Sequence, residues 1–389
     1  MNEFRQLFAV TIMGLCGIPQ RLGASLVIII GMASVVAVTL SILSMSTGFM
    51  RTVNNAGRAD RAIVLSQNAL YEFDSSISRD NAVSIANAPG IRKNADGKPI
   101  ASAESLGYVE VVKKSNGLNA YLLLRGIGPE GFALRPEIKL INGRMFRPAT
   151  HELIVGKSAQ IEFEGLELGS QVPLLEGDWT VTGSFETNGD QNESVLIADS
   201  ETVLSAMRAN TFKSMTVMLD RPDSFGEFKA ALTSNPALAV DVTRETEFLA
   251  TQSKQLNGFL TMIAYVVGGI MGFGALFGAL NTMYSAVSAR SVEIATLRAI
   301  GFPAGAVLAS VFAEALVLAL LGAALGAMVA WIAFNGDLHA VGGLVFTLAV
   351  TPGLVGLGIA LACTLGLVGG LFPAIRAARL PVAVALRAT

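Results

Sequence analysis

The chain has 389 residues, of which 52% are apolar and only 15% are charged, and its formal net charge is −2. Soluble domains carry about 25% charged residues, so this composition argues against a wholly soluble protein. The nearly balanced charge provides no basic surface for nucleic acid, and no nucleic-acid partner is expected.

Charged residues are absent from four long runs, and each run exceeds the roughly 18 to 20 residues that cross a bilayer. These runs are 22–50, 255–289, 315–336 and 338–375. We predict transmembrane helices at 21–50, 256–287, 304–335 and 352–375. The first is longer than the apolar core of a cleaved signal peptide, which has about 7 to 15 residues. We therefore interpret it as an anchor that stays in the membrane.

The segment before the first span, residues 1–20, carries apolar side chains at helical spacing. They are Phe4, Leu7, Phe8, Ile12 and Leu15. Pro19 favours a break between this segment and the span. We predict an amphipathic helix that lies on the inner membrane surface, in contact with membrane lipids.

The charged middle of the chain, residues 51–255, is predicted to be a folded α+β domain. Six stretches rich in β-branched residues predict strands, namely RAIVLSQ, YVEVVKK, AYLLLRGI, HELIVG, WTVTGSF and SMTVMLD. Two further stretches predict helices: SRDNAVSIANAPG, with Ser78 as its N-cap, and SFGEFKAALTSNP. The last residues, roughly 243–257, are expected to continue as helix into the second span.

This domain contains no motif that indicates catalysis, a cofactor or a metal. Gly156-Lys157-Ser158 resembles the end of a phosphate-binding loop, but His151 stands where that motif requires its first glycine. The two histidines, His151 and His339, belong to no ligand-like cluster, so surface positions are expected for both. We expect a non-catalytic chain that binds no cofactor or metal.

Glycines at four-residue spacing occur in three of the predicted spans. The pairs are Gly268–Gly272 and Gly274–Gly278 in the second span, Gly322–Gly326 in the third and Gly366–Gly370 in the fourth. Such pairs let helices approach closely in lipid. The spacing fits packing within one subunit and an interface with a second subunit equally well.

Glu314 is an acidic residue within the third predicted span. A charge at the bilayer centre costs about 2.5 to 3.5 kcal/mol on insertion scales, so such residues face a partner or water. A structural ion pair or a position at the helix end is the favoured interpretation. A functional, proton-linked role is the alternative.

Residues 288–303 form a short charged segment between the second and third spans. Its polar side chains are Arg290, Glu293 and Arg298. Ile294, Leu297 and Ile300 recur at every third position and predict an apolar helix face. Gly301 and Pro303 end the predicted helix.

The distribution of basic residues predicts the topology of the spans. Arg5 and Arg21 precede the first span, the segment 288–303 carries two arginines, and the tail 376–389 carries three and no acid. The loop 336–351 carries an acid and no base. Both termini and the segment 288–303 are therefore predicted to be cytoplasmic, with 51–255 and 336–351 on the outside.

Several stretches resemble one known family. SARSVEIATLRAIGFPAGAVLASVFAEALVLALLGAALG is similar to the core of the FtsX/MacB/LolC–LolE permeases of ABC transporters, and FPAIRAARLPVAVALR is similar to their C-terminal ending. INGRMFRPATHELIVGKSAQIEFEGLELGSQVPLLEGDWTVTGSF is similar to their extracytoplasmic core domain. The tail departs from the family pattern at Pro381, Ala383 and Val384, where an acid and two polar positions are missing.

The resemblance implies a fold and a mode of action. The fold is four transmembrane helices plus a large extracytoplasmic α+β domain, a MacB-type periplasmic core with a β subdomain, in the bacterial inner membrane. The segment 288–303 would be a coupling helix, with Arg290, Glu293, Ile294, Leu297, Arg298 and Gly301 at the contact with the ATPase. An ordinary amphipathic surface loop is the alternative.

The resemblance also implies partners. A cytoplasmic ABC ATPase on a separate chain would bind ATP and Mg, and a second permease, identical or related, would complete the dimer. The expected function is mechanotransmission for export, together with a periplasmic adaptor and an outer-membrane channel. Extraction of lipoproteins or lipids from the inner membrane is one alternative, and an FtsX-like signalling permease that controls cell-wall hydrolases is another. The size of the external domain favours transport over signalling.

Overall fold

The computed structural model describes residues 8, 10–13, 21–54, 56–187, 189–336, 338–341 and 344–379. The chain divides into two compact units. The helical unit comprises Met1–Thr47, Gly258–Asp337 and Ala349–Thr389, and the sheet unit comprises Gly48–Asn257 and Leu338–Leu348. Of the predicted N-terminal helix at 1–20, only residues 8 and 10–13 are described, and they are helical. The tail beyond residue 379 lies outside the described residues.

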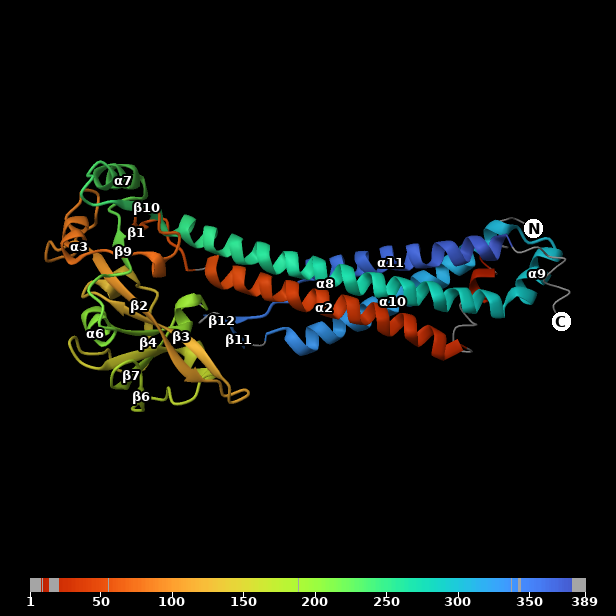
Figure 1. Ribbon diagram of the computed structural model, residues 1–389, viewed down its shortest axis with the longest axis horizontal. Helices are drawn as coiled ribbons and strands as arrows, with labels where there is room; N and C mark the ends of the chain where they lie inside the picture. The colour runs from red at the N-terminus through yellow and green to blue at the C-terminus, as the bar shows by residue number, and fades with distance from the viewer. Residues whose placement is uncertain are drawn as a thin grey trace. The chain divides into compact units, whose positions relative to one another are not determined.

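The helical unit is built from long apolar helices that run alongside one another (Figure 1). Within the described residues, four helices are long and apolar enough to cross a membrane. They are α2 (Leu22–Asn54), α8 (Glu245–Ala289), α10 (Ala304–Phe334) and α11 (Pro352–Ala378). The prediction of four long apolar helices is thus confirmed. The helix α8 starts eleven residues before the second predicted span, as the expected continuation of helix out of the folded domain.

Local sequence signals explain where these helices begin and end. Pro303 is the N-cap of α10, and the Thr351 side chain accepts a hydrogen bond from the backbone N–H of Leu354 at the start of α11. A short helix, α9 (Ser291–Ala299), lies between α8 and α10. It is followed by Gly301, whose φ of +102° favours glycine and stops the helix.

The sheet unit is a mixed sheet of ten strands. The strands are β1 (Arg61–Ser66), β2 (Ala101–Val112), β3 (Asn119–Ile127), β4 (Lys139–Gly143), β5 (Glu152–Gly156), β6 (Gln171–Pro173), β7 (Asp178–Glu186), β8 (Leu196–Asp199), β9 (Ser214–Met218) and β10 (Val240–Arg244). Their order is β10-β1-β9-β2-β3-β8-β5-β7-β4, and β6 pairs with β7. The pairs β3–β8 and β5–β7 are parallel and the other pairs are antiparallel. The pairing of the edge strand β4 with β7 is interrupted by a bulge between Leu140 and Asn142.

Short helices cover and connect these strands. The α-helices are α3 (Arg79–Ala86), α4 (Gly131–Leu134), α5 (Lys157–Glu162), α6 (Ser200–Ala206) and α7 (Phe225–Thr233), and the 3₁₀ helices are η2 (Glu72–Asp74), η3 (Gln191–Ser194) and η4 (Pro222–Ser224). Both predicted helices are present as α3 and α7, and the Ser78 side chain caps α3 by accepting from the N–H of Asn81. All six predicted strands are present as well.

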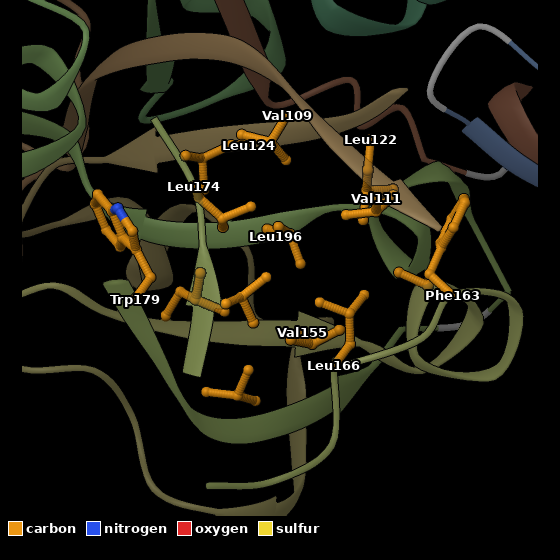
Figure 2. Close-up of a cluster of buried hydrophobic side chains, with 14 of the residues drawn as sticks. Val109, Val111, Leu122, Leu124, Val155, Phe163, Leu166, Leu174, Trp179 and Leu196 are labelled. Atoms are coloured by element: carbon orange, nitrogen blue, oxygen red, sulfur yellow. The ribbon is translucent and has the colours of Figure 1, made fainter. Parts of the chain in front are cut away.

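The two largest apolar clusters among the described residues of the sheet unit lie on different parts of the sheet. One lies among β2, β3, β5, β7 and β8, where Trp179, Phe163 and Leu122 are fully buried (Figure 2). The other lies where α3 and α7 cover β1, β9 and β10, around Phe228, Ile85 and Val217. Burying such side chains contributes about 1.5 to 3 kcal/mol each, which makes these cores the main source of the unit's stability.

The loop between α10 and α11 belongs to the sheet unit and not to the helical one. It forms a hairpin of β11 (Leu338–Val341) and β12 (Leu344–Thr347). Val345 lies in the core around Trp179, and its carbonyl accepts a hydrogen bond of 2.7 Å from the hydroxyl of Ser194. The ring of Phe346 meets that of Phe49 edge to face, with the centroids 5.7 Å apart. The sequence predicted only an external loop here.

Candidate functional site

The predicted coupling segment is a distinct helix, α9, whose two ends are tied to the helical unit by arginines. Arg290 is its N-cap residue; its Nε lies 3.2 Å from Oε2 of Glu293 and its Nη1 lies 3.4 Å from Oε2 of Glu314. Near the other end, Nη1 of Arg298 donates to the carbonyl oxygen of Ala378 at 2.7 Å. That carbonyl belongs to the last residue of α11, so Arg298 satisfies a helix-end acceptor.

The three apolar residues that the sequence predicts on one face of this segment differ in burial. Ile294 is buried in a cluster with Val287, Val307 and Ala374, and Leu297 is half-buried. Ile300 lies beyond the end of α9 and is 71% exposed. The physical reason is the helical period of 3.6 residues: positions spaced by three drift steadily around the axis. The exposed positions are instead Glu293, Thr296, Ala299 and Ile300.

Glu314 is buried on α10, where it is 6% exposed and faces Arg290. Arg21 lies within electrostatic range of Glu314, Glu293 and Arg290. A buried carboxylate needs such partners, because an isolated one would be expensive to desolvate. Ser310, one turn before Glu314, donates from its hydroxyl to the carbonyl of Val10 at 3.1 Å. The polar groups thus gather where α9, α10 and the N-terminal residues meet.

The glycine pairs divide into two kinds. A Cβ atom at Gly322 would lie 2.6 Å from the Cβ of Met32, and one at Gly326 would lie 2.5 Å from the carbonyl oxygen of Ala33, so this pair packs α10 against α2. Gly366 and Gly370 approach Ala319 and Ala315 of α10 in the same way. These four glycines serve packing within one chain.

The glycines of α8 make fewer close contacts with the other helices. A Cβ at Gly268 would meet the hydroxyl of Thr39 at 2.7 Å, and one at Gly272 would make only ordinary contact with Leu365. Around Gly274 and Gly278, no described atom lies within 4 Å of an added Cβ. This second pair is therefore the part of the glycine pattern that intrachain packing leaves unexplained.

The sheet unit contains a buried ionic network that the sequence did not predict. Arg125 of β3 binds Glu72 through Nη2 at 2.9 Å and also binds Glu104 of β2. Arg135 reaches the same Glu104, which is fully buried, at 2.7 Å. Burial opposes ionisation of Glu72, but the Arg125 guanidinium outweighs it and keeps the pKa of this carboxyl below its ordinary value.

A second cluster continues the network around Arg61 of β1. Its Nε donates to Oε2 of Glu245 and its Nη1 to Oε1 of Glu137, both at 2.6 Å. Arg61 is 1% exposed, so both carboxylates are needed to compensate its charge. The sequence hinted at this network only through a single arginine in each of two otherwise apolar strands, RAIVLSQ and AYLLLRGI.

His151 is exposed, as expected, and its ring lies 4.9 Å from that of Trp179. The side chain of His339 lies outside the described part of the structure.

Two family models match the chain. The MacB-like periplasmic core domain matches residues 22–235, and the FtsX-like permease C-terminal domain matches residues 265–382. A curated relative from Hyphomonas neptunium, the macrolide export ATP-binding/permease protein MacB, is 26% identical over an alignment of 237 residues; the match covers 58% of this chain and 36% of the relative. The chain thus spans little more than a third of that relative's length.

Two solved structures are also similar. The crystal structure of the periplasmic region of MacB from Actinobacillus actinomycetemcomitans is 15% identical with a TM-score of 0.39, and the match covers 51% of this chain and 94% of that one. The extracellular domain of the noncanonic ABC-type transporter YknZ from Gram-positive bacteria is 13% identical with a TM-score of 0.36, over 47% of this chain and 99% of that one.

Proposed function

Because the chain belongs to the ABC transporter permease family, as an FtsX-like permease with a MacB-like periplasmic core domain, we propose that it converts ATP hydrolysis into movement of that periplasmic domain. Membership implies a multi-pass membrane protein that works with an ABC ATPase. In the proposal, α9 is the cytoplasmic contact for this ATPase, which binds ATP and Mg. The output is export of a substrate, by mechanotransmission and not through a wide pore.

The observation that carries the proposal is the attachment of α9. Arg290 connects its first turn to α10 through Glu314, and Arg298 connects its last turn to the end of α11. Ile294 fixes the inner side of the helix in the apolar cluster, while Glu293 and Ile300 remain outside. A helix held in this way transfers a push on its outer side to the long helices α10 and α11.

Further components complete the proposed complex. The distribution of arginines supports cytoplasmic termini and a cytoplasmic α9, with the sheet unit in the periplasm. A second permease, identical or related, would pair with this one, and the open glycine pair of α8, Gly274 and Gly278, offers a place for close helix contact. A periplasmic adaptor and an outer-membrane channel would carry the substrate onward.

The proposal is tested by reversing the outer side of α9 without disturbing its inner side. The variant Glu293→Lys/Ile300→Asp should lose co-purification of the partner ABC ATPase, and the permease-stimulated rate of ATP hydrolysis should fall at least about tenfold. Glu201→Lys is the matched control, because Glu201 is also an exposed glutamate in an ion pair but lies in the sheet unit. Thermal unfolding in detergent checks that both variants fold. Unchanged ATPase binding and turnover in the folded α9 variant would refute the coupling role.

A further inference from the structure

The sheet unit contains a cavity of about 260 Å³ whose walls are rich in aromatic rings. The rings are those of Phe49, Tyr71, Phe73, Tyr108 and Phe248. Phe73 and Tyr108 stack nearly parallel, with centroids 4.5 Å apart. The volume lies just below the roughly 300 to 1,000 Å³ of cavities for drug-sized ligands, so the fitting occupant is a small molecule.

The ionic network described above forms the polar wall of this cavity. Glu72, Arg125, Arg135 and Glu245 line it directly. The network comprises three arginines and four glutamates, namely Arg61, Arg125, Arg135, Glu72, Glu104, Glu137 and Glu245. It therefore has one carboxylate more than it has guanidinium groups.

Two pairs of charged groups at the edge of the network leave this excess unchanged. One pair is Arg58, which lies within electrostatic range of Glu137 and Glu245, and its ion-pair partner Asp60. The other pair is Lys213, which donates from Nζ to the carbonyl of Phe73 at 2.8 Å, and Asp190, which lies within electrostatic range of Glu137. Within each pair the charges are opposite and offset each other. The wall keeps one uncompensated negative charge, which favours a cation as occupant.

Glu245 identifies where that cation would bind. Its Oε2 accepts from the backbone N–H of Arg58 at 2.8 Å and from Nε of Arg61 at 2.6 Å. Among the described residues, its Oε1 has no hydrogen-bond donor, although the residue is only 8% exposed. This oxygen is not a fully buried atom, and an ionised carboxylate oxygen accepts hydrogen bonds. A donor inside the cavity would satisfy this oxygen.

We propose that this cavity binds a small organic ammonium ion with an apolar body, its charged head at Glu245 and its body against the aromatic rings. The ring faces attract a cation as well as apolar surface. An anion is disfavoured, because the Nη atoms of Arg125 already donate to Glu72 and Glu104. The guanidinium nitrogens without a partner in the described part of the chain, Nε of Arg125 and Nη1 of Arg135, are fully buried atoms that a ligand does not reach. The inference does not rest on the coupling role of α9, since binding requires no ATPase.

The test uses the full chain in lipid nanodiscs and, as the probe, benzylammonium, whose N–H groups can donate to Oε1 of Glu245. Isothermal titration, corrected with empty nanodiscs, should show saturable binding with one site per chain. Phenylacetate, which has a similar ring but the opposite charge, should bind at least about tenfold more weakly. Absence of saturable probe binding, or phenylacetate binding as tightly, would overturn the proposal.

Two variants locate the site. Glu245→Gln should weaken probe binding at least about tenfold, while the control Glu201→Gln, outside the cavity, should leave it unchanged. Glu245 also pairs with Arg61, so Tyr108→Leu is measured as a second variant that does not depend on the folding of Glu245→Gln. Tyr108 is 47% exposed, so its loss should not prevent folding; it should weaken binding about threefold or more. Wild-type affinity in every folded cavity variant would refute the site.

Discussion

At the scale of single residues, buried charges are the feature that most sharply distinguishes this sheet unit. Glu104 is fully buried on a strand and receives two arginines, Arg125 and Arg135. Arg125 also pairs with Glu72, whereas among the described residues Arg135 forms an ion pair with Glu104 alone, so the arginines depend on this carboxylate. Removal of one partner from such a cluster costs more than the cluster itself contributes to stability.

Glu104→Gln should therefore destabilise the sheet unit strongly, by about 3 to 5 kcal/mol, because two buried guanidinium groups lose their shared countercharge. Thermal unfolding of the purified chain in detergent measures this as a lowered Tm. Glu201→Gln removes one partner of an exposed pair, Arg79–Glu201, and should change stability by less than about 1 kcal/mol. Equal Tm values for the two variants would show that the buried network contributes no more than a surface pair.

At the scale of elements, the helices were easier to predict from the sequence than their contacts were. Charge-free runs predicted α2, α8, α10 and α11, because a helix needs about 20 consecutive apolar residues to cross the hydrocarbon core of a bilayer. The caps at Ser78 and Pro303 were visible as residue types. The sequence did not predict the first half of β2, because its residues, ASAESLG, include few strand-forming types. Pairing with β9 and the arginines around Glu104 override that local preference.

The candidate site was predictable only in part for a similar reason. The sequence located a charged helix at α9 and an acid at Glu314, but it could not show that Arg290 joins them. It also could not show that Ile294, predicted at the contact with the ATPase, packs in the cluster around Val307. Spacing along one helix says which residues share a face, and only the neighbouring helices decide which face is free. The family resemblance itself is confirmed by the matches to both domains.

The glycines of α10 give a prediction at this scale. Gly326→Ala should disturb the packing of α10 on α2, since the added Cβ would lie 2.5 Å from the carbonyl oxygen of Ala33. Overpacking of this kind costs about 1 to 3 kcal/mol and should lower the Tm of the chain in detergent. Gly274→Ala is the control, because the added methyl group meets no described atom within 4 Å. A Tm drop for Gly274→Ala alone would contradict this assignment of the two pairs.

At the scale of the whole molecule, the chain enters the sheet unit twice. The long insertion Gly48–Asn257 begins in the last turns of α2 and ends in the first turns of α8, and the hairpin Leu338–Leu348 connects α10 to α11. Each of the four long helices is therefore joined through the chain to the sheet unit. In the proposed function, a displacement of α9 reaches the sheet unit along the chain, through α2 and α8 at the long insertion and through α10 and α11 at the hairpin.

Phe346→Ala should weaken the second connection. The ring is 2% exposed and packs on Phe49, and loss of a buried phenylalanine costs about 3 to 5 kcal/mol. Hydrogen exchange of residues 338–348 should accelerate at least about a hundredfold, while co-purification of the ATPase stays unchanged. Leu118→Ala, at a residue that is 63% exposed, is the control. If exchange in the hairpin stays at the wild-type rate, the hairpin is held by something other than this ring.

The bulge in β4 affects whether the sheets of neighbouring copies can pair with one another. β4 ends the described sheet, and all five of its residues are exposed, including Leu140 and Ile141. A flat apolar edge of this kind invites a strand from a neighbouring copy. The register shift at Leu140 and Asn142, together with Lys139, makes this edge irregular and charged. Crowded copies can therefore collide without joining their sheets into aggregates.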